Sequence, residues 1–472
     1  MRSLHLPMPS QELRPGGTCR DRVPVGSRAG STKAERQYRG DTLTTRPALL
    51  EVSMEPNRFR HYIGIDWATE AHRICLLDHN GQICAKVSIL HSGTGLAQLL
   101  EWLASHGVDP AFAAVAIETP RGAVVETLVE RGYAVFAINP KQLAHFRDRY
   151  TSAGAKDDDR DAWVGASALR TDPAAFHRVT VDAAELIHLR ELYRTADELR
   201  EEVQRLASRL SEQMNRYYPQ MLALCPSPDQ PVIWDLLELA PLPADALPLT
   251  EEQIASVLRQ RRIRRLTKAQ VLDQLRATPL TLAQGTAAAA AEHALVLVAQ
   301  LRVVHQLRKA TLKHLASLLK KMRQTPTESG APSDAAIIGS LPGAGDLTTA
   351  ALLSESSRSI EERNAPALRA YSGVAPVTRQ SGKQLSVGMR YACNNRLRNA
   401  LYHHAMVSLR EDPIARRHYE RLRQEGHSHA RALRGIGDRW LSVLIAMLRS
   451  GTMYQATRRK AWRAADAAEA SA

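Results

Sequence analysis

The sequence of 472 residues has little cysteine, no long uninterrupted apolar run and fewer acidic than basic residues. Its five cysteines are scattered, form no C-x-x-C pair and do not cluster with histidine. This argues against a zinc site or a disulfide framework and fits a reducing cytoplasm. Because no run of about 18 apolar residues is present, we expect no membrane span and no membrane partner. The chain carries 63 Lys and Arg against 49 Asp and Glu, a formal charge of +14, so nucleic acid is the first candidate ligand.

The first residues lack any sign of a folded element. Residues 1–53 are rich in Arg, Gly, Ser, Thr and Pro, show no helical or strand periodicity, and lack the apolar segment of a secretory signal peptide. Met54 stands just before the first strand-like segment. We therefore expect translation to start at Met54, with residues 1–53 the result of a start assigned too far upstream. The expected division is a disordered leader (1–57), an α/β catalytic domain (58–175), a helical and coiled-coil region (176–330), a mostly helical C-terminal domain (331–455) and a tail (456–472).

The segment from Tyr62 to Thr171 has the pattern of an α/β domain. Three short apolar runs, HYIGIDWA, HRICLLDHNG and QICAKVSIL, predict strands, and Asn80-Gly81 suits a hairpin turn. A helix, a strand, a helix, a strand and a helical tail over 141–171 follow. The order β-β-β-α-β-α-β-α predicts a mixed sheet covered by helices.

Two long segments in the middle of the chain have the heptad period of coiled coils. The first seam consists of Leu192, Ala196, Leu199, Val203, Leu206 and Leu210, and the second of Leu297, Leu301, Val304, Leu312, Leu315, Leu319 and Met322. The two helices either close on each other as an antiparallel hairpin or pair between chains, and the sequence leaves both open. Between them, the run RQRRIRRLTKAQ predicts a basic helix with either a solvated or a phosphate-contacting face.

The C-terminal unit is predicted to be helical and is punctuated by glycine. It begins with two helices joined by the turn LPGAG, where Gly343 and Gly345 would offer backbone N–H groups to a DNA phosphate. A plain turn is the alternative interpretation. A loop rich in Gly, Ser and basic residues then leads into another helix.

Four carboxylates are expected to converge in the α/β domain. Asp66 ends the first predicted strand and Glu118 ends the fourth, and these strand ends can be neighbours in a mixed sheet. Asp158 and Asp161 are three residues apart in a helical segment and therefore share a face. Such carboxylates repel one another unless a hard dication neutralises them, and two Mg²⁺ ions about 4 Å apart would support phosphodiester cleavage.

Two other interpretations of these residues are possible from the sequence. The motif GID also opens actin-like ATPases and sugar kinases, but those need glycine-rich phosphate loops, and the chain has no convincing pair of them. The acidic run over 156–162, taken alone, suits a helix cap and an exposed face.

The motifs GIDWA, AIETP, K-x-D-x-x-D-A at 156–162, LPGAG, and YSGVAP followed by QSGK resemble the insertion-sequence transposases of the DEDD type, described as bridge-RNA-guided recombinases. The resemblance covers about residues 60–450. It implies a ribonuclease H-like (RuvC-like) domain in which Asp66, Glu118, Asp158 and Asp161 bind Mg²⁺ or Mn²⁺, while Asp157 and Asp159 do not ligate. It also implies a nucleophilic serine in the C-terminal domain, for which Ser381 is favoured over Ser372. The family often has two glycines after the serine, whereas here Gly382 is followed by Lys383.

The resemblance predicts a DNA transposase that joins strands through a phosphoserine link, conserving bond energy for rejoining. Residues near Ser381 are expected to hold phosphates or to form an exposed basic loop: Arg379, Lys383, Arg390, Arg396 and Arg398. His403 and His404 are expected to pack or contact phosphate. Expected partners are DNA, a structured guide RNA and further copies of the chain, as a dimer or tetramer, in the prokaryotic cytoplasm at the nucleoid. The alternatives are a RuvC-like junction endonuclease that uses water, and a non-catalytic nucleic-acid-binding scaffold.

Overall fold

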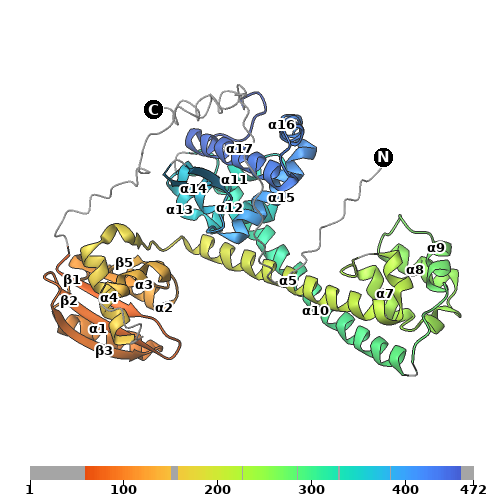
Figure 1. Ribbon diagram of the computed structural model, residues 1–472, viewed down its shortest axis with the longest axis horizontal. Helices are drawn as coiled ribbons and strands as arrows, with labels where there is room; N and C mark the ends of the chain where they lie inside the picture. Colours follow the sequence, from red (N-terminus) through yellow and green to blue (C-terminus); the bar gives the residue numbers. More distant parts are fainter. Residues whose placement is uncertain are drawn as a thin grey trace, which may run out of the picture. The chain divides into compact units, whose positions relative to one another are not determined.

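The computed structural model describes residues 59–149, 158–225, 227–283, 285–327, 330–382 and 384–458. The predicted leader over 1–57 and most of the predicted tail lie outside these residues, so both remain predictions. The described part begins with a mixed α/β domain and continues as helices with one small β-hairpin (Figure 1).

The α/β domain contains a six-stranded sheet in the order β3-β2-β1-β4-β5-β6. Its strands are β1 (His61–Asp66), β2 (Ala71–Asp78), β3 (Ile83–Leu90), β4 (Ala113–Ile117), β5 (Ala134–Ala137) and β6 (His177–Arg178). Its helices are α1 (Gly93–Ser105), η2 (Pro110–Phe112), α2 (Ala123–Glu130), α3 (Pro140–Asp148), α4 (Asp158–Thr171) and η3 (Pro173–Ala175). Strand β1 is antiparallel to β2 and parallel to β4. This mixed sheet is consistent with the ribonuclease H-like fold that the family resemblance implies.

The predicted order of strands and helices is confirmed, with two corrections. The tail over 141–171 is not one helix but α3 and α4, and the short strand β6 was not predicted. The hairpin turn between β2 and β3 lies at the predicted place, where Gly81 adopts a positive φ of 87° that suits glycine. Turn chemistry and hydrophobic period therefore fixed the order of elements well.

Apolar side chains cover both faces of the sheet. Helices α1 and α2 pack on one face, where Leu99 and Leu128 meet Ile65 and Val115. Helices α3 and α4 pack on the other face, where Leu143 and Val164 belong to a second cluster. Burial on both faces explains why β4 is apolar throughout, since a strand covered on both sides has no solvent-facing positions.

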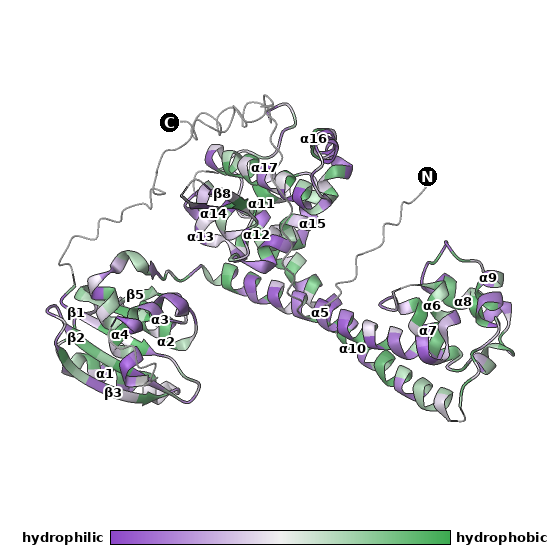
Figure 2. Ribbon diagram, viewed as in Figure 1, coloured by the Kyte–Doolittle hydropathy of each residue, from purple (hydrophilic) through white to green (hydrophobic). Residues whose placement is uncertain are grey.

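Two long helices, α5 (Ala184–Tyr217) and α10 (Thr286–Gln324), pack against each other within the chain. Leu210 near the end of α5 shares a core with Leu297 near the start of α10, whereas Leu189 and Leu319 at the opposite ends share another. The pair is therefore antiparallel, one of the two arrangements left open by the sequence. Hydrophobic and hydrophilic residues alternate along both helices (Figure 2), as this one-sided packing requires.

The expectation of no membrane span rested on the lack of a long apolar run, and one helix of the described residues, α10, is a weak candidate for such a span. By length and composition alone this helix passes such a test, with 33% of its most apolar window buried in the described part of the chain. Since its residues Ala294, Leu297 and Leu301 are fully buried among α5 and its neighbours, we interpret it as the core helix of a helical hairpin.

A small helical unit packs against the C-terminal part of α5 and the N-terminal part of α10. It comprises α6 (Pro219–Leu224), α7 (Pro231–Leu239), η4 (Pro243–Ala246), α8 (Glu251–Gln260) and α9 (Lys268–Leu275). The predicted basic helix over 259–270 is wrong, because α8 ends at Gln260 and α9 begins at Lys268. Arg262 takes a positive φ of 55°, and Thr267 caps α9 with its side chain.

The C-terminal unit is helical, as predicted, with a hairpin inserted. Its elements are α11 (Asp334–Gly339), α12 (Asp346–Glu355), α13 (Ser357–Glu361), α14 (Ala365–Tyr371), β7 (Val377–Ser381), β8 (Gln384–Gly388), α15 (Asn395–Glu411), α16 (Pro413–Gln424) and α17 (His429–Ser450). The strands β7 and β8 replace what the sequence indicated as a loop. The start of α5 contributes to the core of this unit through Leu189 and Tyr193.

Candidate active site

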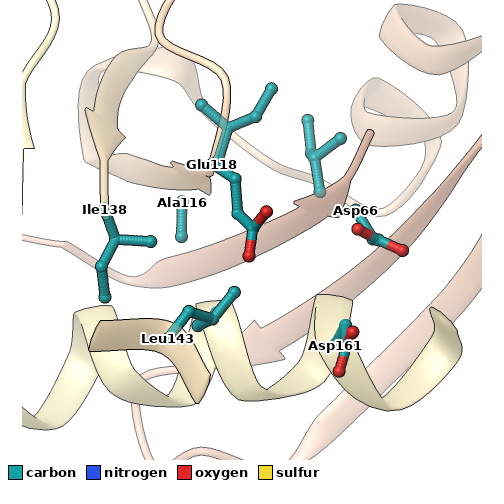
Figure 3. A pocket seen from close by; sticks show the side chains of 9 residues that line it. Asp66, Ala116, Glu118, Ile138, Leu143 and Asp161 are labelled. Carbon is teal, nitrogen blue, oxygen red and sulfur yellow. The ribbon is translucent and has the colours of Figure 1, made fainter. Parts of the chain in front are cut away.

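The carboxyl ends of β1 and β4 bring two of the predicted ligands together. The strands are parallel neighbours with Ile65 opposite Ile117, so Asp66 and Glu118 follow each other in register. Both line a small pocket that also includes Asp161 on α4. Figure 3 shows the carboxylates of Asp66 and Glu118 at adjacent strand ends and that of Asp161 on the helix facing them.

Close contact between α4 and β1 positions Asp161. A Cβ added to Gly64 would lie 1.8 Å from the carbonyl oxygen of Ala162, so only glycine allows the helix to sit this near the strand. On α4, Ala162 and Ala166 pack with Cys75 beneath them. Small residues on both elements therefore set how closely α4 approaches β1, and with it the position of Asp161.

Asp161 is buried, with 5% of its surface exposed, and forms an ion pair with Arg147 of α3. The Arg147 Nε lies 2.6 Å from Oδ1, and Nη2 donates to Oδ2 at 2.8 Å. Burial of one carboxylate without a countercharge is unfavourable, and this guanidinium supplies the countercharge at the pocket. Sequence reasoning missed Arg147, because nothing in its neighbourhood distinguishes it from other basic residues of a solvated helix.

The remaining aspartates of the acidic run are placed only in part. Asp158 is the first residue of α4, but its side chain lies outside the described structure, as does Asp157. Asp159 was expected to face solvent. It is half-exposed, but it also lies 3.7 Å from Nε of Arg73, the residue opposite Asp66 on β2.

The donor set fits a hard dication in kind. Asp66, Glu118 and Asp161 offer only carboxylate oxygens to one pocket, which is the ligand type that Mg²⁺ and Mn²⁺ prefer. Within the described residues, no three His, Cys, Asp or Glu side chains lie close enough together to form a metal site. That Asp66, Glu118, Asp158 and Asp161 together hold an ion therefore stays a prediction.

The favoured and competing serines differ sharply in accessibility. Ser381 ends β7 at the tip of the exposed β7–β8 hairpin, where it faces Gln384 across the ladder. Ser372 is fully buried at the end of α14, and its hydroxyl donates to the carbonyl of Arg369. Of the two, only Ser381 is open to an incoming phosphate in this structure.

The predicted phosphate-binding residues of the C-terminal unit have diverse surroundings. Arg379 is exposed on β7, two residues before Ser381. Arg390 donates to the carbonyl of Ala375, and Arg398 to the sulfur of Cys393. Lys383 lies outside the described residues. These positions lie within or after the hairpin in the sequence, and no Asp or Glu occurs anywhere from 363 to 410.

Two predicted contacts are occupied within the chain. Arg396 forms ion pairs with Asp197 and Glu198 of α5, both at 3.2 Å, so it joins the helical hairpin to this unit and does not present a free charge. The N–H of Gly343 donates to the carboxylate of Glu411 at 2.6 Å. A phosphate at Gly343 would have to displace Glu411, and Gly345 stays a prediction as the residue preceding α12.

A buried ion pair also joins α5 to the C-terminal unit. Glu355 accepts hydrogen bonds from Arg194 at 2.7 and 3.1 Å and from Asn394 at 2.8 Å. Burial raises the pKa of the Glu355 carboxyl, but the bonds from Arg194 and Asn394 outweigh this and hold the pKa below its usual range. Asn394 caps the N-terminus of α15, so this pair braces the element that follows the Ser381 hairpin.

His404 packs in the core of the C-terminal unit, which is one of the two roles, packing or phosphate contact, that the sequence predicted. It is fully buried, stands 5.6 Å from the Trp440 ring between centroids, and its Nε2 lies 3.1 Å from the carbonyl of Pro342. Burial lowers the pKa of His404 to about 4. The ring is therefore neutral near pH 7, and its Nε2–H donates a hydrogen bond to the Pro342 carbonyl in the LPGAG turn.

Comparisons with known proteins agree on one family. Residues 63–219 match a DEDD transposase family of the IS110 type, and residues 335–420 match the family described as transposase IS116/IS110/IS902. A putative transposase y4uE of Sinorhizobium fredii is 42% identical over 268 residues, covering 55% of this chain and 75% of that protein. The mini-circle putative transposase for IS117 of Streptomyces coelicolor is 33% identical over 403 residues, covering 81% of this chain and 92% of the relative. A protein of insertion element IS116 from Streptomyces clavuligerus is 25% identical over 409 residues, covering 85% and 98%.

Proposed function

Because the chain belongs to the IS116/IS110/IS902 family of transposases, we propose that it excises and inserts its DNA element by metal-assisted, serine-mediated strand exchange. The observation that carries this proposal is the presence of two separate reactive groups. One is the carboxylate pocket of the α/β domain, and the other is the exposed Ser381 of the C-terminal unit. A hydrolytic nuclease needs only the first.

The carboxylate pocket is proposed to act on the scissile phosphate. Asp66, Glu118 and Asp161, together with Asp158, would hold Mg²⁺ or Mn²⁺, which when bound supplies neutralisation of developing negative charge. Gly64 keeps α4 close enough for Asp161 to share the pocket with the strand-end carboxylates. Arg147 balances the charge of Asp161, so its guanidinium would compete with a bound ion for this carboxylate.

Ser381 is proposed as the nucleophile. Its hydroxyl oxygen would form a bond to phosphorus while the bond from phosphorus to a deoxyribose oxygen breaks, and that oxygen leaves with a proton. Arg379 lies on the same face of the hairpin, since alternate residues of a strand point the same way. Its guanidinium would bind the nonbridging oxygens of the same phosphate.

RNA guidance and assembly extend the proposal. The stretch over 363–410 contains eight Lys and Arg residues and no Asp or Glu. Arg363, Arg369 and Arg396 form ion pairs within the chain, and the other five favour a polyanion here. We propose DNA ends and a structured guide RNA as its ligands, a dimer or tetramer as the active form, and the cytoplasm with its nucleoid as the place of action.

Replacing Ser381 tests the nucleophile directly. Ser381→Ala should abolish strand exchange and the covalent protein–DNA adduct while leaving DNA binding intact. Ser386→Ala is the matched control, because Ser386 is exposed on the same face of the hairpin, opposite Arg379. Full recombination by Ser381→Ala would rule out the serine mechanism.

The two alternatives give different results in two assays. A junction endonuclease that uses water would cleave DNA without leaving an adduct on denaturing gels. A non-catalytic scaffold would show the same metal binding by calorimetry after Asp66 and Asp158 are both changed to Asn. The proposal requires an adduct in the first assay and loss of metal binding in the second.

A further inference from the structure

Three arginine side chains gather near the base of the β7–β8 hairpin. Arg431 and Arg434 are three residues apart on α17 and therefore share one face of that helix. Arg398 lies on α15, which packs against α17 (Figure 1). Within the residues that the structure describes, none of the three forms an ion pair with a carboxylate. Like charges held close together repel one another, so this grouping needs an explanation.

The contact between α15 and α17 brings the three side chains together. A Cβ added to Gly437 of α17 would lie 3.9 Å from the carbonyl oxygen of Leu401 on α15, so the two helices approach closely there. Arg434 and Arg398 each precede these contact positions by about one turn of their own helix. The charge of Arg398 acts on Arg434, and so does the charge of Arg431.

The N–H groups of two of these arginines meet sulfur atoms. Nη1 of Arg434 lies 3.2 Å from the sulfur of Met389, and Nη1 of Arg398 lies 3.6 Å from the sulfur of Cys393. Sulfur accepts hydrogen bonds only weakly, so these contacts hold a guanidinium in position without neutralising its charge. A phosphate oxygen would be a much stronger acceptor for the same N–H groups.

The three charges do not contribute to the stability of the fold. Asp438 stands four residues after Arg434 on α17, the spacing of a favourable helical ion pair, but Arg369 donates to both of its carboxylate oxygens. Arg431 lies in the first turn of α17, where a positive charge opposes the helix dipole. Burial lowers the pKa of the Arg434 guanidinium, and the charges of Arg431 and Arg398 lower it further, while Tyr391 acts in the opposite direction. The cation is therefore less favourable in the folded chain than in the unfolded one.

The position of the cluster relates it to the hairpin that carries Ser381. Ser381 faces Gln384 at one end of β8, and Met389 follows the other end of this strand. The extended strand separates these two points by about 17 Å, at roughly 3.4 Å per residue. Duplex DNA carries a phosphate on each strand about every 3.4 Å along its axis. DNA held at Ser381 can therefore place a different phosphate at Arg434.

We propose that Arg398, Arg431 and Arg434 form a second anion-binding site, which holds a backbone phosphate of the DNA away from the phosphate attacked by Ser381. This inference rests on the proposed function and adds a positioning site to it. Guanidinium groups bind the nonbridging oxygens of a phosphate through paired hydrogen bonds, and the bound anion offsets the repulsion among the three cations. Backbone phosphates are the same in every sequence, so the site would position the DNA without reading its bases.

The test measures binding of the full-length protein to a fluorescently labelled, mixed-sequence DNA duplex by anisotropy over a series of salt concentrations. Arg431→Gln should weaken binding by about 10-fold, because it removes a charge-assisted hydrogen bond. It should also lower the slope of log affinity against log salt by about 1. Arg434→Lys keeps the charge but loses the planar fork, so it should bind more weakly than the wild type with the slope unchanged.

The melting temperature separates this role from a structural one. Arg431 is exposed, and Arg431→Gln should melt at or above the wild-type temperature because it relieves repulsion. Arg449→Gln is the matched control for loss of a charge, since Arg449 lies exposed in the last turn of the same helix. It should bind DNA as the wild type does.

Double variants test whether the site is separate from the hairpin. Arg431→Gln combined with Arg434→Gln should lose less affinity than the product of the two single losses, because both arginines bind one phosphate. Arg431→Gln combined with Arg379→Gln should lose the full product, because these arginines would bind different phosphates.

Wild-type affinity in Arg431→Gln, or an equal loss in Arg449→Gln, would overturn the site. A lowered melting temperature of Arg431→Gln would show that the charge is structural, and would overturn it as well. Weaker binding of a structured RNA probe, with duplex binding unchanged, would overturn the assignment to DNA. Failure of the wild-type protein to bind the duplex would instead refute the proposed function, and the site with it.

Discussion

Gly64 is the residue whose replacement tests the geometry of the carboxylate pocket most directly. In Gly64→Ala the new Cβ would stand 1.8 Å from the Ala162 carbonyl oxygen and 2.8 Å from the Ala166 nitrogen. Both atoms belong to the backbone of α4, so no side-chain rotation relieves the contact. To reach 3.0 Å, the closest approach that real Cβ atoms show, strand and helix must separate by at least 1.2 Å, the difference between the two distances.

This separation would displace Asp161, which directly precedes Ala162 on α4. Overpacking of this kind costs about 1–3 kcal/mol of stability. A misplacement of about 1 Å at a reacting centre costs on the order of 100-fold in rate. We therefore expect Gly64→Ala to fold with a lowered melting temperature, to bind Mn²⁺ more weakly by calorimetry, and to lose about 100-fold in strand exchange.

Gly95→Ala is the matched control for this substitution. Its new Cβ would lie 2.1 Å from the carbonyl oxygen of Leu90, so it creates a comparable backbone clash in the same domain. Gly95 does not line the carboxylate pocket. The control should lose stability but keep the metal affinity of the wild type. A folded Gly64→Ala protein with wild-type metal affinity and strand exchange would refute the view that the close approach of α4 to β1 positions the carboxylate pocket.

Three further substitutions test charges within the described structure. Arg147→Ala should increase apparent Mn²⁺ affinity by roughly 10-fold in calorimetry, because it removes a charge-assisted partner that competes for Asp161; unchanged affinity would contradict that competition. Arg194→Ala should lower the free energy of unfolding by about 3–5 kcal/mol in urea, because the buried Glu355 carboxylate loses its countercharge, and a loss below about 1 kcal/mol would show the pair to be solvent-screened. His404→Gln should flatten the pH dependence of the free energy of unfolding. In the wild type the folded-state pKa of His404 is about 4, so as pH falls below 6.5 the imidazole takes up a proton in the unfolded chain before it does in the folded one. This difference destabilises the wild type by about 2 kcal/mol at pH 5, and glutamine has no such proton to bind. Parallel stability curves of His404→Gln and the wild type between pH 7 and pH 5 would contradict it.

Local patterns determined most of the α/β domain. Alternating apolar runs, the Asn80-Gly81 turn and helix stops set the order of its elements, and parallel pairing of β1 and β4 brought Asp66 beside Glu118 as expected. The same patterns failed over 259–270, where basic composition resembles a helix. There, the positive φ of Arg262 and the cap formed by Thr267 divide the segment.

The β7–β8 hairpin was missed for a related reason. Its strands are five residues each, exposed, and mostly polar, so they lack the alternation that identifies a half-buried strand. The sequence indicated Ser381 only through resemblance. Its exposure, and the burial of Ser372, depend on how α14 and the hairpin fold over the core beneath them.

By itself, the sequence determined the type of domain, the carboxylates at the strand ends, the heptad period of the long helices and the basic character of the C-terminal unit. Only the tertiary structure decided that Arg147 pairs with Asp161, that Arg396 binds α5, that Glu411 takes the N–H of Gly343, and that Arg434 meets Met389. The physical reason is that periodicity and turn chemistry act between near neighbours. An ion pair or a ring contact joins residues whose spacing along the chain carries no signal, and it forms only after the backbone has brought them together.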